Sequence, residues 1–426
     1  MDTIFALASA RGRAGVSVIR ISGDQAYAAA EQLCGRLPEP RRAALRVLRF
    51  GGDVLDEALV LRFEAGASFT NEDIVELHVH GGVATVAAIL RSLGSITGLR
   101  IAEPGEFSRR ALESGRMDLT QIEGLADLID AETEAQRRQA VALLSGALGK
   151  RAEGWRLKLI RAMSLLEATI DFSEEDVPES VSAEVQTLLT AVRGEIRSEL
   201  AGAKSAERIR EGFEIAIIGA PNVGKSTLLN ALAGREAAIT SEIAGTTRDV
   251  IEVRMEISGL AVTLLDTAGL RETTDSIEGR GIELALARAR NADLRLFLMD
   301  GGEELPLQPT GDDIVVMAKA DLKPEAVDGV SGLTGAGLDA LVAKIGQVLE
   351  TMTAGSSLVI RERQRRGLET AISALDRALK LVVEEGVAEL AAEDLRNAVA
   401  GLAGLVGRVG VEDLLEEIFS RFCIGK

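Results

Sequence analysis

The chain has 426 residues, which is enough for roughly two to four domains. Its hydrophobic fraction of 46% and charged fraction of 27% are typical of a globular protein, and no window of about 18 apolar residues predicts a membrane span. The net charge of −18, with one Trp and one Tyr, argues against a long nucleic-acid-binding surface, which needs concentrated Lys and Arg and aromatic side chains. A local basic patch is compatible with this charge, and if the protein acts on RNA we expect a partner to hold much of that RNA.

The N-terminus and the cysteines indicate a cytoplasmic protein. The N-terminal segment MDTIFALASARGRAG lacks the basic and then apolar layout of a signal peptide. Cys34 and Cys423 are the only cysteines. One pair so far apart in sequence does not form a disulfide framework, which fits a reducing compartment.

The N-terminal quarter of the chain mixes short β-like runs with glycine turns and predicts an α+β domain over residues 1–116. The alternating apolar runs predict strands at residues 16–23, 59–63 and 73–82. The segment after them, residues 84–93, is predicted to be a helix. His78 and His80, the only histidines, lie two residues apart on a strand and share one face. Because no third ligand follows from the sequence, we expect packing or polar contacts for them rather than a metal.

Residues 117–209 and 353–426 are mostly helical in pattern. Apolar side chains recur at three- and four-residue spacing in residues 159–170, and stripes of the same kind run through the tail. A helical tail of about 70 residues with one apolar face is marginal alone, so we expect the two helical segments to pack together. The α/β segment between them, residues 210–352, would then be inserted into a helical domain.

Residues 210–352 alternate strand and helix, as a βαβ array does. The strands are expected at residues 213–218, 260–266, 293–300 and 313–318. The predicted fold class is therefore multidomain, with an N-terminal α+β domain, a helical domain and an inserted α/β domain.

Residues 219–226 read GAPNVGKS and match the phosphate-binding loop G-x-x-x-x-G-K-[ST]. A strand precedes the loop and a helix follows it, which is the context that the motif requires. The backbone N–H groups of the loop would surround the phosphates, Lys225 would face the β- and γ-phosphates, and the Ser226 hydroxyl would bind Mg²⁺. The inserted domain is therefore expected to be a Ras-like P-loop domain.

Two short motifs complete the phosphate end of the predicted site. Residues 266–269 read DTAG and follow a strand, where Asp266 would face Mg²⁺ through water and Gly269 would contact the γ-phosphate. Residues 245–249 read GTTRD and lie upstream, in the position of a switch loop whose threonine completes the coordination of Mg²⁺.

Base selection should come from residues 318–321, which read AKAD. The Asp321 carboxylate can accept hydrogen bonds from N1–H and the amino group of guanine, which adenine does not offer, so GTP is favoured. The usual motif is Asn-Lys-x-Asp, and Ala318 lacks the amide. Because one missing hydrogen bond costs about 0.5–1.5 kcal/mol, we expect weakened guanine affinity. Residues 331–333, SGL, stand where a backbone loop would contact the guanine oxygen.

The catalytic water has no obvious partner. Leu270 occupies the position where Ras-type enzymes have a glutamine, and a leucine cannot orient water. Asn222 is a candidate ligand of a monovalent cation that would supply the charge otherwise brought by an arginine finger. Glu278 is a candidate for polarising the water, although a glutamate in a polar loop is more often simply solvated.

Over essentially its full length the sequence resembles the MnmE family (also called TrmE), the bacterial tRNA-modification GTPases. The resemblance is carried by GRAGVSVIRISG at 12–23, SFT at 68–70 with 76–82, PGEF at 104–107, MDLTQ at 117–121, GREAAITSEIAGTTRD at 234–249 and CIGK at 423–426. The terminal tetrapeptide together with an internal GTPase domain is highly specific to this family.

The resemblance implies a tetrahydrofolate-binding and dimerisation domain at 1–116, a helical domain in two parts at 117–209 and 353–426, and a G domain at 210–352. It implies a homodimer and a flavin-dependent partner, MnmG (GidA), that together add an aminomethyl or carboxymethylaminomethyl group to C5 of the wobble uridine of certain tRNAs. The methylene carbon would come from 5,10-methylenetetrahydrofolate, of which 5-formyltetrahydrofolate is an analogue. GTP and K⁺ would bring the two G domains together and activate hydrolysis.

The resemblance also assigns roles to single residues. The K⁺ ligands fall on Asn222, Ser241, Ile243 and Thr246, with Ile243 acting through its carbonyl, and the Mg²⁺ ligands fall on Ser226 and Thr247. The water-polarising glutamate falls on Glu278. The folate contacts fall on Arg20, Glu76, Arg116 and Lys426. The family commonly has Lys at position 116, and Arg keeps the charge with a different geometry.

Two further assignments follow from the matched motifs. The family's cysteine near the folate pocket falls on Cys423, for which packing in the C-terminal segment is an equal alternative. The expected GTP-binding set is Asn222, Val223, Gly224, Lys225, Ser226, Thr227, Ser241, Glu242, Ile243, Ala244, Gly245, Thr246, Thr247, Asp266, Thr267, Ala268, Gly269, Lys319, Asp321, Ser331, Gly332 and Leu333.

Two other functions compete with this interpretation. A GTP-switch factor of ribosome assembly, like the Era and EngA relatives, would carry an RNA-binding module, and no Gly-x-x-Gly clamp in a basic setting is found. A G domain that binds nucleotide without turnover is supported by Leu270 and Ala318, and measurable GTP hydrolysis would exclude it.

Overall fold

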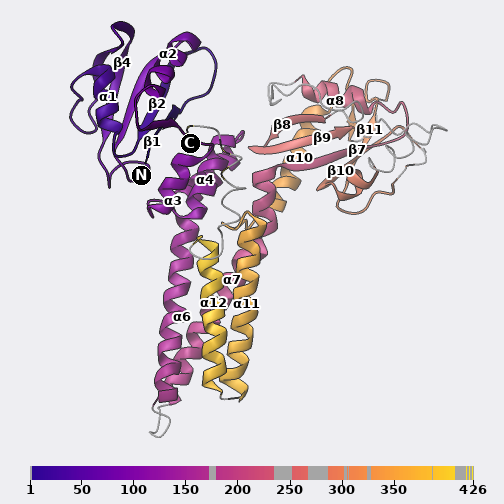
Figure 1. Ribbon diagram of the computed structural model, residues 1–426. Coiled ribbons are helices and arrows are strands. Elements are labelled where there is room, and N and C mark those ends of the chain that lie inside the picture. The colour runs from indigo at the N-terminus through magenta and orange to yellow at the C-terminus, as the bar shows by residue number, and fades with distance from the viewer. Residues whose placement is uncertain are drawn as a thin grey trace, which may run out of the picture. The chain divides into compact units, whose positions relative to one another are not determined.

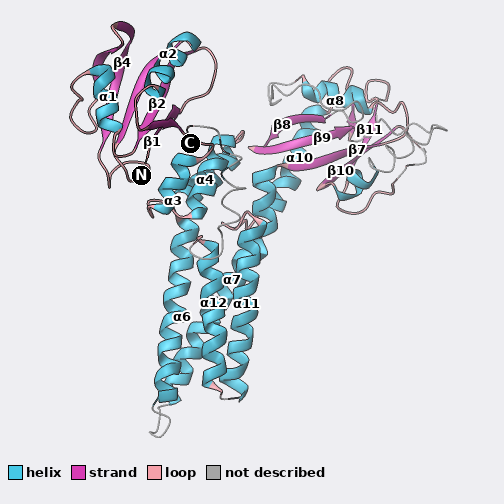
Figure 2. Ribbon diagram, in the orientation of Figure 1, coloured by secondary structure: helices cyan, strands magenta, loops and turns pink. Residues whose placement is uncertain are grey.

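The computed structural model describes residues 2–171, 179–234, 252–266, 286–301, 305, 307–323, 328–385, 387–407, 419, 422 and 425. The chain forms two compact units, residues 1–126 with 402–426 and residues 127–401. Figures 1 and 2 show their helices and strands. The predicted fold class, with an α+β N-terminal region, long helices and an inserted α/β sheet, is confirmed, while the domain boundaries stay a prediction.

The first unit is built on a six-stranded sheet in the order β3-β4-β5-β2-β1-β6. Its neighbouring strands pair antiparallel, except that β1 and β6 are parallel. The strands are β1 Thr3–Leu7, β2 Ala14–Ser22, β3 Ala44–Phe50, β4 Asp53–Phe63, β5 Ile74–Gly81 and β6 Leu99–Ile101. The helices are α1 Ala26–Cys34, α2 Val83–Gly94, α3 Glu106–Glu113 and α4 Leu119–Asp130, the last of which continues into the second unit.

Side-chain alternation along the strands decides which face of this sheet is covered. In β5, Val75, Leu77 and Val79 are buried in the core that α1 and α2 complete. Glu76, His78 and the strongly exposed His80 alternate with them and therefore lie on the other face. The strands predicted at 16–23, 59–63 and 73–82 overlap β2, β4 and β5, and the helix predicted at 84–93 lies within α2, so these four elements are confirmed.

The helices of the second unit come from two distant parts of the chain. They are α5 Glu134–Leu144, α6 Ala147–Asp171, α7 Glu179–Glu211, α10 Leu338–Thr353, α11 Glu362–Lys380 and α12 Ala388–Leu405, with a π-helical turn at Leu381–Glu385. The long helices lie side by side (Figure 1). Arg197 on α7 pairs with Asp376 on α11 at 2.8 Å, and Arg396 on α12 pairs with Glu167 on α6 at 3.3 Å. The predicted packing of the two helical segments is therefore confirmed.

A second six-stranded sheet is inserted between α7 and α10, in the order β12-β11-β10-β7-β9-β8. Only β8 and β9 are antiparallel. Its elements are β7 Phe213–Ile218, α8 Lys225–Ala233, β8 Glu252–Ile257, β9 Leu260–Asp266, β10 Leu294–Met299, β11 Ile314–Ala318 and β12 Gly329–Val330. The four strands predicted for this domain correspond to β7, β9, β10 and β11.

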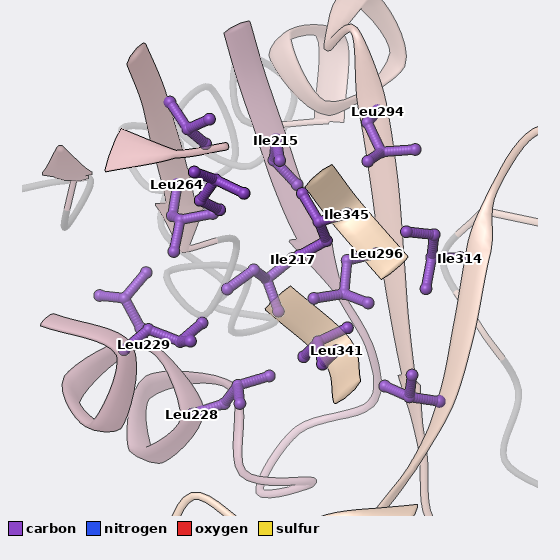
Figure 3. Close-up of a cluster of buried hydrophobic side chains, with 14 of the residues drawn as sticks. Ile215, Ile217, Leu228, Leu229, Leu264, Leu294, Leu296, Ile314, Leu341 and Ile345 are labelled. Carbon is purple, nitrogen blue, oxygen red and sulfur yellow. The ribbon is translucent and has the colours of Figure 1, made fainter. Parts of the chain in front are cut away.

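The core of this domain explains why its central strands are apolar throughout. On one face, Ile215 and Ile217 of β7 pack with Leu296 of β10 beneath α8 and α10 (Figure 3). On the other face, Ala216 and Ile218 pack against Phe297 and Ala289. A parallel strand that is covered on both faces has no polar side to alternate with. The loop that follows β7 therefore emerges at the carboxyl edge of a rigid sheet.

In the described part of the chain, no helix is both long enough and apolar enough to cross a membrane.

Candidate functional site

The P-loop lies between β7 and α8 and is shaped by left-handed backbone. Asn222 has φ 61° and Gly224, the residue before α8, has φ 111°. Gly219 also has no room for a side chain, because a Cβ there would collide with the carbonyl oxygen of Leu298 on β10. This geometry places successive backbone N–H groups and the N-terminus of α8 around one small region, which favours an anion.

The Lys225 side chain is held over this loop. Its Nζ donates to the carbonyl oxygens of Gly219 at 2.8 Å and Ala220 at 2.9 Å. The side chain is 6% exposed. Burial lowers the pKa of the Lys225 ammonium, and the nearby charge of Asp266 opposes that shift. The loop thus holds a partly desolvated positive charge against two neutral carbonyls, where phosphate oxygens would be stronger partners.

Ser226 and Asp266 form the second part of the phosphate site. The Ser226 Oγ donates to Asp266 Oδ2 at 2.7 Å. Asp266 stands at the end of β9, opposite Ile217 of β7, and is 5% exposed. A hydroxyl and a carboxylate at this distance are the hard oxygen donors that Mg²⁺ takes beside nucleotide phosphates. These two residues therefore fit the magnesium ion that the motif implies.

The segment predicted to read the base begins at a buried residue. Ala318, at the end of β11, is 2% exposed and belongs to the core beneath α8 and α10. Lys319 follows in left-handed conformation, and its Nζ pairs with Asp300 Oδ2 at 2.5 Å. Lys323 binds the other carboxylate oxygen at 2.6 Å, and hydrogen bonds from Lys319 and then Lys323 lower the pKa of Asp300. Asp321 is exposed at this edge.

The loop at residues 331–333 rests on the start of α8. The buried Ser331 Oγ accepts hydrogen bonds from the backbone N–H of Leu333 at 3.3 Å and of Thr334 at 3.2 Å. A Cβ built at Gly332 would lie 2.7 Å from the backbone nitrogen of Leu228 on α8. The predicted base-contacting loop is thus brought directly beside the P-loop helix.

The first unit contains a separate cavity of about 350 Å³. It is lined by Phe63, Ala67, Ser68, Phe69, Ile74, Glu76, Arg116, Met117 and Gln121. Behind it, Arg20 on β2 binds Glu76 Oε1 on β5 through Nε at 3.0 Å and Nη2 at 2.9 Å. Of the four predicted folate residues, Glu76 and Arg116 thus line the cavity and Arg20 is paired with Glu76.

Arg20 is also fixed by aromatic rings. Its guanidinium carbon lies 5.2 Å from the ring centre of Phe69 and 5.6 Å from that of Phe107. Both distances are within the range of cation–π attraction. The rings and the carboxylate together hold the guanidinium in one orientation.

The two histidines make polar contacts, as expected. His78 Nε2 lies 3.3 Å from Glu76 Oε2, on the oxygen that Arg20 does not use. His80 Nδ1 lies 2.8 Å from Asp56 Oδ1, and the His80 backbone N–H donates to the other oxygen of Asp56. Burial raises the pKa of Asp56, but these hydrogen bonds outweigh it, so the pKa is lowered overall.

Comparison with known proteins decides the family. Residues 3–116 match the family described as GTP-binding protein TrmE N-terminus, and residues 119–423 match the MnmE helical domain family. The tRNA modification GTPase MnmE of Cereibacter sphaeroides (strain ATCC 17025 / ATH 2.4.3) is 60% identical and that of Ruegeria pomeroyi is 58% identical, each over 100% of both chains. The chain belongs to the MnmE family of tRNA modification GTPases.

Among solved structures, the chain resembles the G domain of the T. maritima FeoB iron transporter, at 23% identity and a TM-score of 0.23, over 32% of this chain and 98% of that one. The full-length match to MnmE relatives, rather than this likeness, supports the tRNA-modification interpretation over the ribosome-assembly alternative.

The structure gathers only part of the MnmE site predicted from the sequence. Lys225, Ser226 and Asp266 meet at the P-loop, and the loop at 331–333 lies beside it. Gly425 of the terminal tetrapeptide lies against Leu7 of β1. The other predicted positions lie outside the described residues: Ser241, Glu242, Ile243, Ala244, Gly245, Thr246, Thr247, Thr267, Ala268, Gly269, Leu270, Glu278, Cys423 and Lys426.

Three residues of these sites had no assigned role in the sequence. Phe69 and Phe107 stack on Arg20, and both lie in motifs that mark the MnmE family, SFT and PGEF. The sequence signal for these two residues was their place in the motifs, because a motif residue without a chemical role is expected to have a structural role. Asp300, which binds Lys319, had no signal beyond its place at the end of a predicted strand.

Proposed function

We propose that this chain is a K⁺-activated GTPase that works with a flavin-dependent MnmG partner to modify C5 of the wobble uridine in certain tRNAs. GTP hydrolysis in tRNA modification is the activity of the family to which the chain belongs. K⁺ activation, folate as carbon donor, the homodimer, the MnmG partner and a cytoplasmic location are parts of the proposal.

The observation that carries this proposal is the arrangement of Lys225, Ser226 and Asp266 around the P-loop. The loop N–H groups and the N-terminus of α8 would bind the triphosphate, and Lys225 would exchange its two carbonyl partners for phosphate oxygens. Ser226 and Thr247 would bind Mg²⁺ directly and Asp266 would face it through water, and the ion supplies charge stabilisation on the phosphates when it is bound. Glu278 would then polarise the attacking water.

Of the four proposed K⁺ ligands, Asn222 lies among the residues that the structure describes. Its left-handed backbone, φ 61°, is a conformation that asparagine tolerates better than most residues. We propose that its side-chain oxygen, with Ser241, Ile243 and Thr246, binds the cation beside the phosphates. The cation would supply the charge that an arginine finger brings in other GTPases.

The folate would occupy the cavity of the first unit. A pterin ring offers neighbouring N–H donors, and the Glu76 carboxylate is oriented by Arg20 to accept from such a pair. Arg116 lines the same cavity and supplies positive charge. Lys426 would add a second cation, and Cys423 would lie nearby. Bound 5,10-methylenetetrahydrofolate supplies a one-carbon unit to the modification.

Steady-state GTP hydrolysis in K⁺ against Na⁺ at equal ionic strength tests the proposal. We compare wild type with Asn222→Gly, which removes the side chain without straining the left-handed backbone, and with Asn230→Ala, an exposed asparagine on α8. Turnover that is fast only in K⁺, lost in Asn222→Gly and kept in Asn230→Ala supports the mechanism. Equal slow rates in both salts would contradict K⁺ activation.

A further inference from the structure

Arginines gather on one edge of the first unit, although the chain as a whole is acidic. The segment 36–50 contains Arg36, Arg41, Arg42, Arg46 and Arg49, and its only acidic residue is Glu39. This concentration stands in a chain with a net charge of −18. It is also purely arginine, because the first lysine of the sequence is Lys150.

The fold arranges these residues, here called the β3 arginine edge, along the side of the sheet. β3 is the last strand in the order β3-β4-β5-β2-β1-β6, so one of its sides has no strand neighbour. Arg36 follows α1, and its carbonyl oxygen accepts a hydrogen bond from Arg46 Nε at 3.0 Å. β3 covers most of the segment from Arg42 to Arg49, with a register shift between Leu48 and Arg49, and at about 3.3 Å per residue the backbone of that segment spans at most about 23 Å.

Backbone contacts hold the edge in place without neutralising it. The Arg41 N–H donates to the Arg62 carbonyl oxygen at 2.9 Å, and its Nη2 donates to the Ala67 carbonyl oxygen at 3.0 Å. These partners are neutral, so the guanidinium charge is kept. Arg36, Arg41, Arg42 and Arg49 are exposed.

Among the described residues, the arginines of the edge differ from many arginines of the helical bundle in pairing with no carboxylate. Among the described residues, none of its five arginines forms an ion pair with a carboxylate. By contrast, arginines of the helical bundle pair with carboxylates within 3.3 Å, as do Arg137, Arg138, Arg156, Arg161, Arg193, Arg197 and Arg396. The charge of these bundle arginines is thus balanced by ion pairs, whereas the guanidinium groups of the β3 arginine edge bind no carboxylate among the described residues.

We infer that the β3 arginine edge binds the phosphodiester backbone of the substrate tRNA directly. The guanidinium group presents forked N–H donors that match phosphate oxygens. Arginines spread over a backbone span of about 23 Å can reach several phosphates of one RNA strand. With few aromatic side chains in the chain, the contact would position the RNA without reading its sequence. This inference rests on the proposed function, which makes tRNA the substrate.

Binding of an unmodified tRNA transcript to the full-length protein tests the inference, by fluorescence anisotropy between 50 and 300 mM KCl. Each neutralised phosphate adds about 0.7–0.9 to the slope of log K against log salt, which corresponds to about five- to eightfold in affinity at about 0.1 M. The variant Arg42→Gln/Arg49→Gln is therefore expected to bind about 25- to 60-fold more weakly, with a shallower salt slope. Arg42→Lys/Arg49→Lys should keep most of the slope, because the charge remains.

The matched control is Arg161→Gln/Arg197→Gln, which makes the same charge change at exposed, carboxylate-paired arginines of the bundle. It should leave RNA affinity within about twofold of wild type, since those charges are already balanced. An equal loss in both glutamine variants, or less than threefold loss at the edge, would overturn the inference. GTP hydrolysis is measured for every variant, so failure of the proposed GTPase function would appear there and not as a change in RNA affinity.

Discussion

A glycine on α7 sets how closely the segment that follows the inserted domain can pass that helix. A Cβ built at Gly202 would lie 2.8 Å from the backbone nitrogen of Ser357, and still closer to the carbonyl oxygen of Gly355. The Ser357 N–H also donates to the Gly202 carbonyl oxygen at 3.4 Å. The colliding atoms belong to the backbone, so no change of rotamer relieves them. Gly202→Ala is expected to push this segment away from α7.

The expected magnitude comes from two opposing terms. Alanine is better than glycine in a helix interior by about 0.5–1 kcal/mol, while overpacking against fixed atoms costs about 1–3 kcal/mol. Gly202→Ala should therefore lower the free energy of unfolding by up to about 2.5 kcal/mol. Gly194 is also within α7, and no atom lies within 4 Å of a Cβ built there. Gly194→Ala should show only the gain, about 0.5–1 kcal/mol.

Urea unfolding of the full-length protein, followed by far-UV circular dichroism, compares the two variants. We expect the Gly202→Ala midpoint to fall below wild type and the Gly194→Ala midpoint to rise above it. If Gly202→Ala is stabilised as much as Gly194→Ala, the segment yields at no cost and the reasoning about close backbone contact is refuted.

Two further predictions concern the first unit. Burial disfavours the Glu106 carboxylate, but hydrogen bonds from Arg100, the Glu103 N–H and Arg110 outweigh it, so its pKa lies below the usual 4.5. The contribution of the ionised Glu106 to folding stability is complete above about pH 4.5 and is lost as the pH falls through the lowered folded-state pKa. Glu106→Gln should therefore reduce the fall in the urea midpoint between pH 6 and pH 3. An unchanged pH profile would contradict the assignment. Arg20→Gln removes the charged partner of Glu76 and should weaken binding of 5-formyltetrahydrofolate about 10- to 100-fold, as measured by calorimetry. Arg91→Gln, at an exposed position of α2, is the control. Equal folate affinities of Arg20→Gln and wild type would show that Arg20 is not part of the folate site.

Local motifs made the nucleotide site predictable. The strand, loop and helix around Lys225 and Ser226 are consecutive in sequence, so the spacing alone defines their geometry. Asp266 joined them because the strand order of a parallel sheet places the carboxyl ends of β7 and β9 side by side. The inserted arrangement followed from hydrophobic periodicity on either side of the sheet.

Other features depend on contacts that no local pattern contains. The stacking of Phe69 and Phe107 on Arg20 arises because β2, the loop before β5 and α3 converge in the folded unit. β3 was not predicted, since its arginines interrupt the apolar alternation of an edge strand, and β6 has only three residues. The pairing of Lys319 with Asp300 likewise joins the ends of two neighbouring strands.

The divided helical bundle has a consequence for biosynthesis. α7 ends at Glu211 and α11 begins at Glu362, so the part of the packing on α7 that α11 supplies is made only after the inserted domain is complete. At about 5–20 residues per second, translation of that interval takes about 8–30 s. During this time α7 lacks its contacts with α11 and is packed only against the helices that precede it. The nascent bundle is therefore a natural client for a chaperone, and early folding of the inserted domain would shorten the loop that must close.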